Sequence, residues 1–433
     1  MATDYVSGLF GTQDWQADQD PEHWDTVIAM YGPKGTAPLQ AIFAAMGSAS
    51  IASKDINWFE RITATMRGAI TGIYTTPTLA VAYTSGGVSG TQLHVKMSAD
   101  DAAQIRAGQL LLLRDASISI NDHVVLVTAI TKDGANSFAT TTLLETDNNG
   151  STESVDISDA DVFMIIGNAN AEGGSTPANL SRIPTKFENQ TEIFWEPLRL
   201  TNTALVTDLR TDPGTLAEKQ AETFERYMIQ KEWANIFGVQ STTYDADGEE
   251  IRTMDGILTA IRANTSNLFD YRRDTDYSGD SWKQSGYDFL QANLEVLGRR
   301  GTNRKVAFCG GISLLGMTQL AETYGDIQLN PRSTEFGLDV VTWITPGFTI
   351  DLVRHPLFVQ EATLRHAMLV LEPQYLKRKV LRPTKYLVDP NRDRGGEGAI
   401  DGIVEGWREE CTLKYENIDS MGFFSGVGNA NAV

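Results

Sequence analysis

The sequence has 433 residues, more than one hydrophobic core usually organises, so we expect two or three substructures. Its 36 basic and 56 acidic residues give a formal net charge of −20, which argues against a general nucleic-acid-binding protein. The apolar fraction of 41% and the charged fraction of 21% exclude the disordered and fibrous classes.

Cysteine usage and hydropathy indicate the cellular compartment in which the protein is expected. Cys309 and Cys411 lie far apart, without the spacing of a metal site or a disulfide framework, which fits a reducing environment. No stretch approaches the roughly 20 apolar residues that span a bilayer, and the N-terminus lacks the basic flank and apolar run of a secretory signal. We therefore expect a soluble cytoplasmic product with no membrane partner.

Residues 1–55 form the first predicted segment, an N-terminal arm. It carries Trp15, Trp24 and Tyr31 among Gly, Asp and Pro residues, and residues 1–60 hold two lysines against eight acids. This composition is too aromatic for a solvated tail and too irregular for a separate core. We expect the arm to pack on another surface.

Two extended runs bracket a small β module. The runs Asn57–Tyr83, in segment 56–92, and Glu192–Val206, in segment 168–212, are rich in branched and aromatic side chains that suit strands. The strands predicted in the intervening segment 93–167 are Leu110–Leu113, Val124–Ile130, Phe138–Leu144 and Val162–Ile166. This order predicts a long hairpin with an all-β module inserted at its tip.

The clearest helix is Leu216–Phe237. Thr215 and Glu218 have the spacing of a capping box, and Gly238 follows as a C-terminal stop. At 1.5 Å per residue, about 22 residues span roughly 33 Å, so we predict a strut. The residues expected to define it are Thr215, Glu218, Phe224, Tyr227, Met228 and Phe237.

The rest of the chain predicts an α+β body. The expected elements are helices Met254–Arg262, Tyr287–Leu297 and Ile312–Tyr324, strand Lys305–Cys309, and two strands, Val340–Thr345 and Phe348–Val353, joined by a Pro-Gly turn.

No motif indicates catalysis. The strand and double glycine around Cys309 lack the spacings of a dinucleotide fingerprint, a P-loop and a nucleophile elbow. A calcium-like loop from Asp245 has Gly256 where a bidentate Glu is required, and the five histidines lack zinc-ligand spacing. We expect no catalytic residue, no cofactor and no metal.

One basic strip stands out in this acidic chain. Residues 362–394 hold eight Lys or Arg against three acids. The clustered members are Lys377, Arg378, Lys379, Arg382 and Lys385. The strip is either an ordinary solvated face or a surface that meets an acidic neighbour or packaged nucleic acid.

The order of these parts resembles the major capsid protein fold of tailed phages, with its N-arm, E-loop hairpin, spine helix, P-domain and A-domain. More narrowly it is similar to the subgroup with a β module inserted in the E-loop. The phrases that carry the likeness are residues 165–173, 189–194, 216–238 and 401–414.

The resemblance implies a division of the chain. It gives an N-terminal arm at 1–55, a first E-loop leg at 56–92, an inserted β module at 93–167, a returning leg at 168–212, the spine helix and P-domain at 213–302, an A-domain at 303–361, and a return to the P-domain with C-terminal strands at 362–433.

It also implies a structural role. Copies of the chain would form hexamers and pentamers of an icosahedral head that encloses double-stranded DNA, with no enzymatic activity. Further expected partners are scaffolding, portal and decoration proteins, with DNA bound only non-specifically, in a virion capsid assembled in the host cytoplasm. No fused scaffold ahead of residue 55 is recognised, so proteolytic maturation is not expected. No cross-linking motif is matched, so the resemblance carries no covalent cross-link over to this chain.

Under this interpretation four aromatic residues contact neighbouring copies: Trp15 and Trp24 in the arm, and Phe194 and Trp195 in the returning leg. The alternative is that they lie in the subunit's own core. Two rival functions remain: a cellular nanocompartment shell of the same fold, and a β-rich hydrolase with converging His and acidic side chains.

Overall fold

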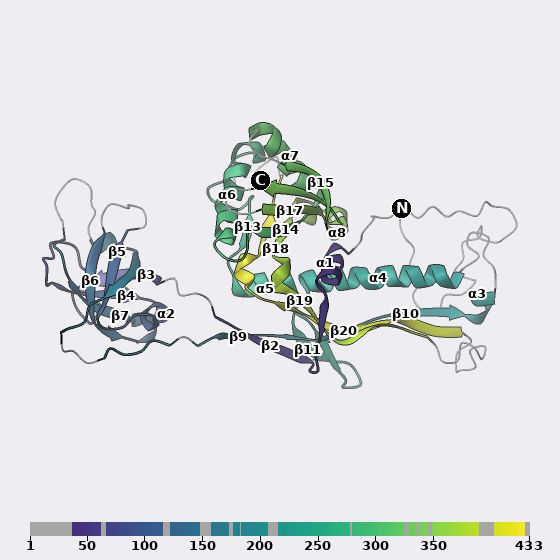
Figure 1. Ribbon diagram of the computed structural model, residues 1–433, viewed down its shortest axis with the longest axis horizontal. Helices are drawn as coiled ribbons and strands as arrows, with labels where there is room; N and C mark the ends of the chain where they lie inside the picture. Colours follow the sequence, from purple (N-terminus) through teal and green to yellow (C-terminus); the bar gives the residue numbers. More distant parts are fainter. Residues whose placement is uncertain are drawn as a thin grey trace. The chain divides into compact units, whose positions relative to one another are not determined.

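The computed structural model describes residues 37–61, 66–115, 122–147, 157–172, 176–181, 183–206, 215–277, 279–324, 329–335, 338–344, 349–388 and 402–428 (Figure 1). The chain divides into two compact units. One is Arg61–Thr185, and the other is formed by the chain before and after it. Helices and strands both contribute to the larger unit, so the predicted α+β class is confirmed.

The unit Arg61–Thr185 is a closed six-stranded barrel in the order β3-β4-β7-β6-β5-β8. Its strands are β3 (Arg67–Tyr74), β4 (Gln92–Met97), β5 (Gln109–Arg114), β6 (His123–Thr131), β7 (Phe138–Leu143) and β8 (Val162–Asn168). Along β5 burial alternates, with Leu111 and Leu113 inside the barrel and Leu112 half-buried between them. Closure leaves no free sheet edge, which accounts for a self-contained unit.

The barrel begins earlier than the sequence predicted. The run Asn57–Tyr83 was expected to be a hairpin leg, but β3 within it pairs with both β4 and β8. A barrel needs a strand at this position to close, and β3 buries Ile70 and Ile73 in the barrel core. The module therefore occupies residues 61–185 rather than 93–167.

Short legs of a hairpin lie in the larger unit. Strands β2 (Asp55–Glu60) and β9 (Thr185–Gln190) form a two-stranded sheet. Trp58 stacks on Phe187 with ring centroids 5.9 Å apart and meets Tyr415 edge-on at 5.1 Å. The legs are thus held by aromatic packing against the body.

The returning run Glu192–Val206 is not a free leg. Its strand β10 (Glu192–Thr201) pairs antiparallel with β20 (Gly402–Tyr415) over ten residues, and a short helix α3 (Asn202–Val206) ends it. The four-stranded sheet has the order β1-β19-β20-β10, with β1 (Ser48–Ser50) and β19 (Leu376–Leu387) completing it. The expected leg is therefore an integral strand of the body.

The predicted strut is present as α4 (Thr215–Phe237), a helix of 23 residues. It runs alongside β10 and β20 (Figure 1). Beyond it lies a hairpin of β11 (Ser241–Tyr244) and β12 (Glu250–Thr253).

A seven-stranded sheet forms the rest of the body, in the order β13-β21-β18-β14-β17-β16-β15. Its strands are β13 (Leu268–Asp270), β14 (Arg304–Cys309), β15 (Leu329–Glu335), β16 (Leu338–Ile344), β17 (Thr349–Arg354), β18 (Met368–Leu371) and β21 (Gly422–Ser425). Because β13, β18 and β21 lie outside residues 303–361, the expected A-domain segment is not a closed structural unit.

Helices α5 (Ile257–Asn264), α6 (Trp282–Gly298), α7 (Gly311–Tyr324) and α8 (Pro356–Gln360) accompany this sheet. Helix α6 starts five residues earlier than predicted, because Ser281 and Gln284 form a capping box that the sequence analysis missed.

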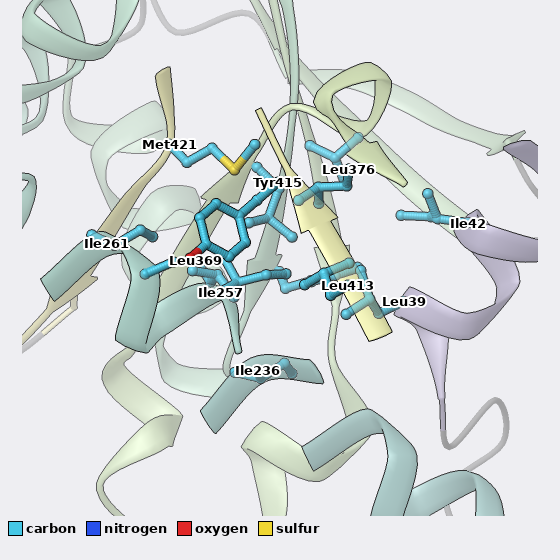
Figure 2. Close-up of a cluster of buried hydrophobic side chains, with 14 of the residues drawn as sticks. Leu39, Ile42, Ile236, Ile257, Ile261, Leu369, Leu376, Leu413, Tyr415 and Met421 are labelled. Carbon is cyan, nitrogen blue, oxygen red and sulfur yellow. The ribbon is translucent and has the colours of Figure 1, made fainter. Parts of the chain in front are cut away.

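A buried cluster joins the strut, the N-terminal helix α1 (Pro38–Met46) and the sheets. Figure 2 shows Leu39 of α1, Ile236 of α4 and Ile257 of α5 converging on Leu413 and neighbouring residues of β20. Such a shared core fixes where each element lies relative to the others.

The stop after α4 depends on close backbone approach. A Cβ atom at Gly238 would lie 2.5 Å from the carbonyl oxygen of Ala234 and 2.6 Å from that of Met254. We predict that Gly238→Ala lowers the free energy of unfolding of the unassembled chain by about 1–3 kcal/mol through overpacking. Urea unfolding followed by tryptophan fluorescence measures this. Gly279→Ala is the control, since nothing lies within 4 Å of its added Cβ; equal losses in both variants would refute the explanation.

Candidate assembly surfaces

A buried carboxylate on β20 anchors α4 to the sheet. The Nζ atom of Lys231 lies 2.6 Å from Oε2 of Glu409, and the two side chains are 2% and 0% exposed. Tyr227 and Thr384 each donate a hydroxyl hydrogen bond of 2.7 Å to the same oxygen, and Arg378 pairs with the carboxylate from β19. A buried charge is costly unless it is paired and hydrogen-bonded, and Glu409 meets both conditions.

Lys231 is itself affected by burial. Removal from water lowers the pKa of its ammonium group to about 8. The ammonium also lies 5.2 Å from the centroid of the Tyr227 ring. Helix and strand therefore share a buried polar contact, to which Arg226 of α4 adds a part-buried ion pair of 3.0 Å with Glu196 of β10.

A second buried carboxylate on β20, that of Glu410, binds side chains from other elements. Glu410 pairs with Arg252 of β12 at 2.9 Å and with Arg382 of β19 at 3.2 Å, and it accepts a hydrogen bond of 3.0 Å from the Thr191 hydroxyl. Glu405, further along β20, accepts a 2.6 Å hydrogen bond from the hydroxyl of Tyr386. Strand β20 thus carries a row of buried carboxylates that bind side chains of the neighbouring elements.

These pairs explain part of the basic strip. Arg378 and Arg382 neutralise the buried acids of β20, and Lys377 pairs with Glu416 at 2.9 Å. Lys379 and Lys385 have no ion-pair partner among the residues that the structure describes. The strip is therefore neither wholly solvated nor wholly available to a partner.

The helix that follows the arm is tied to α4. The backbone N–H groups of Leu39 and Gln40 donate to the carboxylate of Glu232 at 2.7 and 3.2 Å, and His355 lies 3.1 Å from it. An anion at a helix N-terminus satisfies backbone donors that the helix leaves unpaired. The chain leading from the arm is thus held on the strut.

The four aromatic residues expected at subunit contacts divide into three groups. Trp15 and Trp24 lie outside the described residues. Phe194 is only 6% exposed and packs with Tyr227 in the subunit's own core, which is the alternative position considered for these residues. Trp195 is 56% exposed, because adjacent residues of a strand point to opposite faces.

The strut residues mostly face inward. Tyr227 is buried with Met228 packed beside it, and the ring of Phe224 lies 4.7 Å from that of Trp407. Phe237 packs against the main core. Glu218 is half-buried in the first turn, whereas the side chain of Thr215 is outside the described set, so the capping box remains a prediction.

The β11–β12 hairpin of the body is largely exposed. Every residue from 241 to 251 is exposed, including Tyr244 at 68% and Ile251 at 47%. The calcium-like loop is its turn, in which the Asp245 carboxylate accepts hydrogen bonds from the N–H groups of Asp247 and Glu249. A two-stranded hairpin is marginally stable by itself, so this one is a candidate for contact with a partner.

The sequence motifs examined for chemistry show no such role. Burial raises the pKa of the Cys309 thiol to about 12, which keeps it protonated and unreactive. Within the described ranges, no group of three His, Cys, Asp or Glu side chains is arranged to hold a metal ion. None of the helices seen in those ranges is long and apolar enough to cross a membrane.

We predict that Lys231→Met lowers the free energy of unfolding by about 3–5 kcal/mol, because Glu409 loses one of its two cations, Lys231 and Arg378, while staying buried. The double variant Lys231→Met/Glu409→Gln should recover part of the loss, since the buried position 409 then carries no charge, although Arg378 loses its partner. A double-mutant cycle from urea unfolding of the unassembled chain measures both. Arg299→Met, which breaks an exposed pair with Glu295, should cost less than about 1 kcal/mol. Simple additivity of the Lys231 and Glu409 effects would contradict the coupling.

Comparison with solved structures gives only low overall similarity. A structure of Mycobacterium phage Bobi has 10% sequence identity and a TM-score of 0.41, covering 94% of this chain and 96% of that one. The holo-SrpI encapsulin complex from Synechococcus elongatus PCC 7942 has 11% identity and a TM-score of 0.35, covering 57% of this chain and 76% of that one.

Comparison of sequences is more specific. A "Major capsid protein" of Pseudomonas phage PaMx41 is 24% identical over 198 residues, which is 45% of this chain. The chain matches about half the length of that relative, 46%. The family profile described as "SU10 major capsid protein" matches residues 6–428, nearly the whole sequence. This confirms the resemblance found in the sequence: the chain belongs to the SU10 major capsid protein family, a family of structural capsid proteins and not of enzymes.

Proposed function

We propose that copies of this chain form hexamers and pentamers that close into an icosahedral phage head around double-stranded DNA. The observation that carries the proposal is the family match over residues 6–428. Rings of identical subunits need heterologous contacts, in which one surface of a copy binds a different surface of the next. The chain offers separate surfaces of this kind.

Two such surfaces are exposed within the larger unit. The β11–β12 hairpin exposes apolar side chains on a thin element with little support of its own. Trp195 and Phe59 are exposed on strands where the preceding residue, Phe194 or Trp58, is buried. Exposed aromatic residues next to a rigid strand suit contact with a second subunit.

The interior of the proposed shell need not bind DNA tightly. A subunit charge of −20 repels phosphate groups, so contact with packaged DNA would be non-specific and confined to local basic patches. We assign β2 and β9 to the E-loop, the barrel to its insertion, α4 with β10, β19 and β20 to the P-domain, and the seven-stranded sheet to the A-domain. The proposed location is the virion capsid, assembled in the host cytoplasm.

Other copies of the chain are the main proposed partners, with scaffolding, portal and decoration proteins as further ones. Residues 1–30 of the arm are proposed to bind a neighbouring copy through Trp15 and Trp24. In this proposal the arm links one subunit to the next, while α1 and α4 hold the body of each subunit rigid.

Electron microscopy of the purified full-length chain tests this function. We predict closed particles of uniform size with five- and six-fold capsomers, and a truncation of residues 1–30 that stays folded by circular dichroism but forms no such particles. Full-length chain that stays monomeric at concentrations of tens of micromolar, with and without co-expressed scaffolding protein, would refute the shell function.

The rival nanocompartment would show itself in the cargo of the same particles. Particles from infected cells that hold double-stranded DNA support a phage head. Particles that hold a specific enzyme and no DNA would favour the nanocompartment.

A further inference from the structure

The four-stranded sheet has a second face, opposite α4. Phe194 points toward α4, so Trp195 points away from it, and strand pairing places Arg408 and then Lys385 beside Trp195 on this second face. The guanidinium of Arg408 lies 5.7 Å from the centroid of the Trp195 ring. Arg199, four residues along β10, shares the same face and is exposed. We call this surface, Arg199, Trp195, Arg408, Lys385 and Lys379, the outer sheet face.

The outer sheet face carries unbalanced positive charge. Two described acids beside it are already paired: Glu410 is bound by Arg252 and Arg382, and Glu416 by Lys377 and Lys414. No acid in the part of the chain that the structure describes forms an ion pair with Arg199 or Lys385. In a protein with a net charge of −20, this face is a local exception that calls for an anionic partner.

The hairpin tip, residues 244–250, has the complementary character. Asp245, Asp247 and Glu249 are all exposed, and neither Asp247 nor Glu249 forms an ion pair with any described residue. Tyr244 beside them is 68% exposed. The tip therefore offers negative charge together with an aromatic ring, as the outer sheet face offers positive charge together with Trp195.

We propose that the outer sheet face of one copy binds the hairpin tip of a second copy. The proposal rests on the shell function, and it assigns a pair of surfaces to one contact between neighbours.

The tip of the same copy does not occupy this face. The base of the hairpin is held at one end of the sheet, where Arg252 reaches Glu410 and the backbone oxygen of Thr191. From there every residue of the tip is exposed, so it is not docked on its own subunit. A tip on one subunit and its receptor on another make a heterologous contact, the kind that builds rings and lattices.

Nucleic acid is the less favoured occupant. The outer sheet face is small, and its basic side chains surround an exposed tryptophan. The net negative charge of the whole subunit repels phosphate groups. A protein segment with acids and an aromatic side chain matches both of its features, whereas a phosphate backbone matches only the charge.

Charge exchange between the two surfaces tests the proposal. The face variant is Arg199→Glu/Lys385→Glu, and the tip variant is Asp247→Lys/Glu249→Lys; none of these side chains forms an ion pair with a described residue. At low ionic strength each should abolish particles at a protein concentration where the full-length wild type assembles, because like charges then face each other. The combined variant, with both surfaces reversed, should restore particles. Electron microscopy and static light scattering provide the readout.

Controls separate this contact from other causes. Asp276→Lys/Asp280→Lys reverses two exposed acids in another loop and should assemble like wild type. Thermal melting shows whether each variant is folded.

Two results would overturn the contact while leaving the shell function intact: single-surface variants that assemble normally, or folded variants whose combination restores nothing. Normal particles of the face variant with reduced DNA content would instead identify nucleic acid as the occupant. Failure of the wild type to assemble would refute the shell function itself.

Discussion

The buried carboxylate of Glu409 is the interaction on which the rest of the larger unit depends. It lies near the middle of β20 and is approached by Lys231 from α4 and by Arg378 from β19. An isolated carboxylate in this position would cost several kcal/mol, so the strand is stable there only when helix and sheet are both in place. The strut and the sheet are therefore set as one body.

That constraint determines which side chains are left outside. Once α4 covers one face of β10, the strand must bury Phe194 and expose Trp195. The same alternation places Lys385 on the far face, where it forms no ion pair with a described residue, while Arg378, on the near face, pairs with Glu409. The surfaces available for assembly therefore depend on which side chains are buried and ion-paired inside the subunit.

Local signals in the sequence predicted the elements well. The strut α4 was found from its length and its glycine stop, and the strands of the barrel from short branched runs between turns. The partners of those elements were harder to predict, because β10 pairs with β20 about 210 residues away and no local pattern reports such a contact. Strand β3 was misassigned for the same reason, since its role comes from closing a barrel.

The candidate surfaces were predicted only in part. Burial of three glutamates in β20 was not predicted, because charged side chains are seldom buried unless paired, and their partners come from distant segments. The basic strip was visible as composition, but which of its members are free depends on strand register. The hairpin tip was interpreted as a solvated turn, and its exposure became informative only beside the outer sheet face.

Under the proposed contact, a subunit completes its interior by itself and leaves the hairpin and the outer sheet face for its neighbours. Hydrogen exchange of unassembled subunits and of purified particles tests this most directly. We expect amides of α4 and β20 to be equally protected in both, and amides of residues 241–251 to gain protection at least tenfold only in particles. Slow exchange of the hairpin in free subunits, or a strut that becomes protected only on assembly, would contradict it.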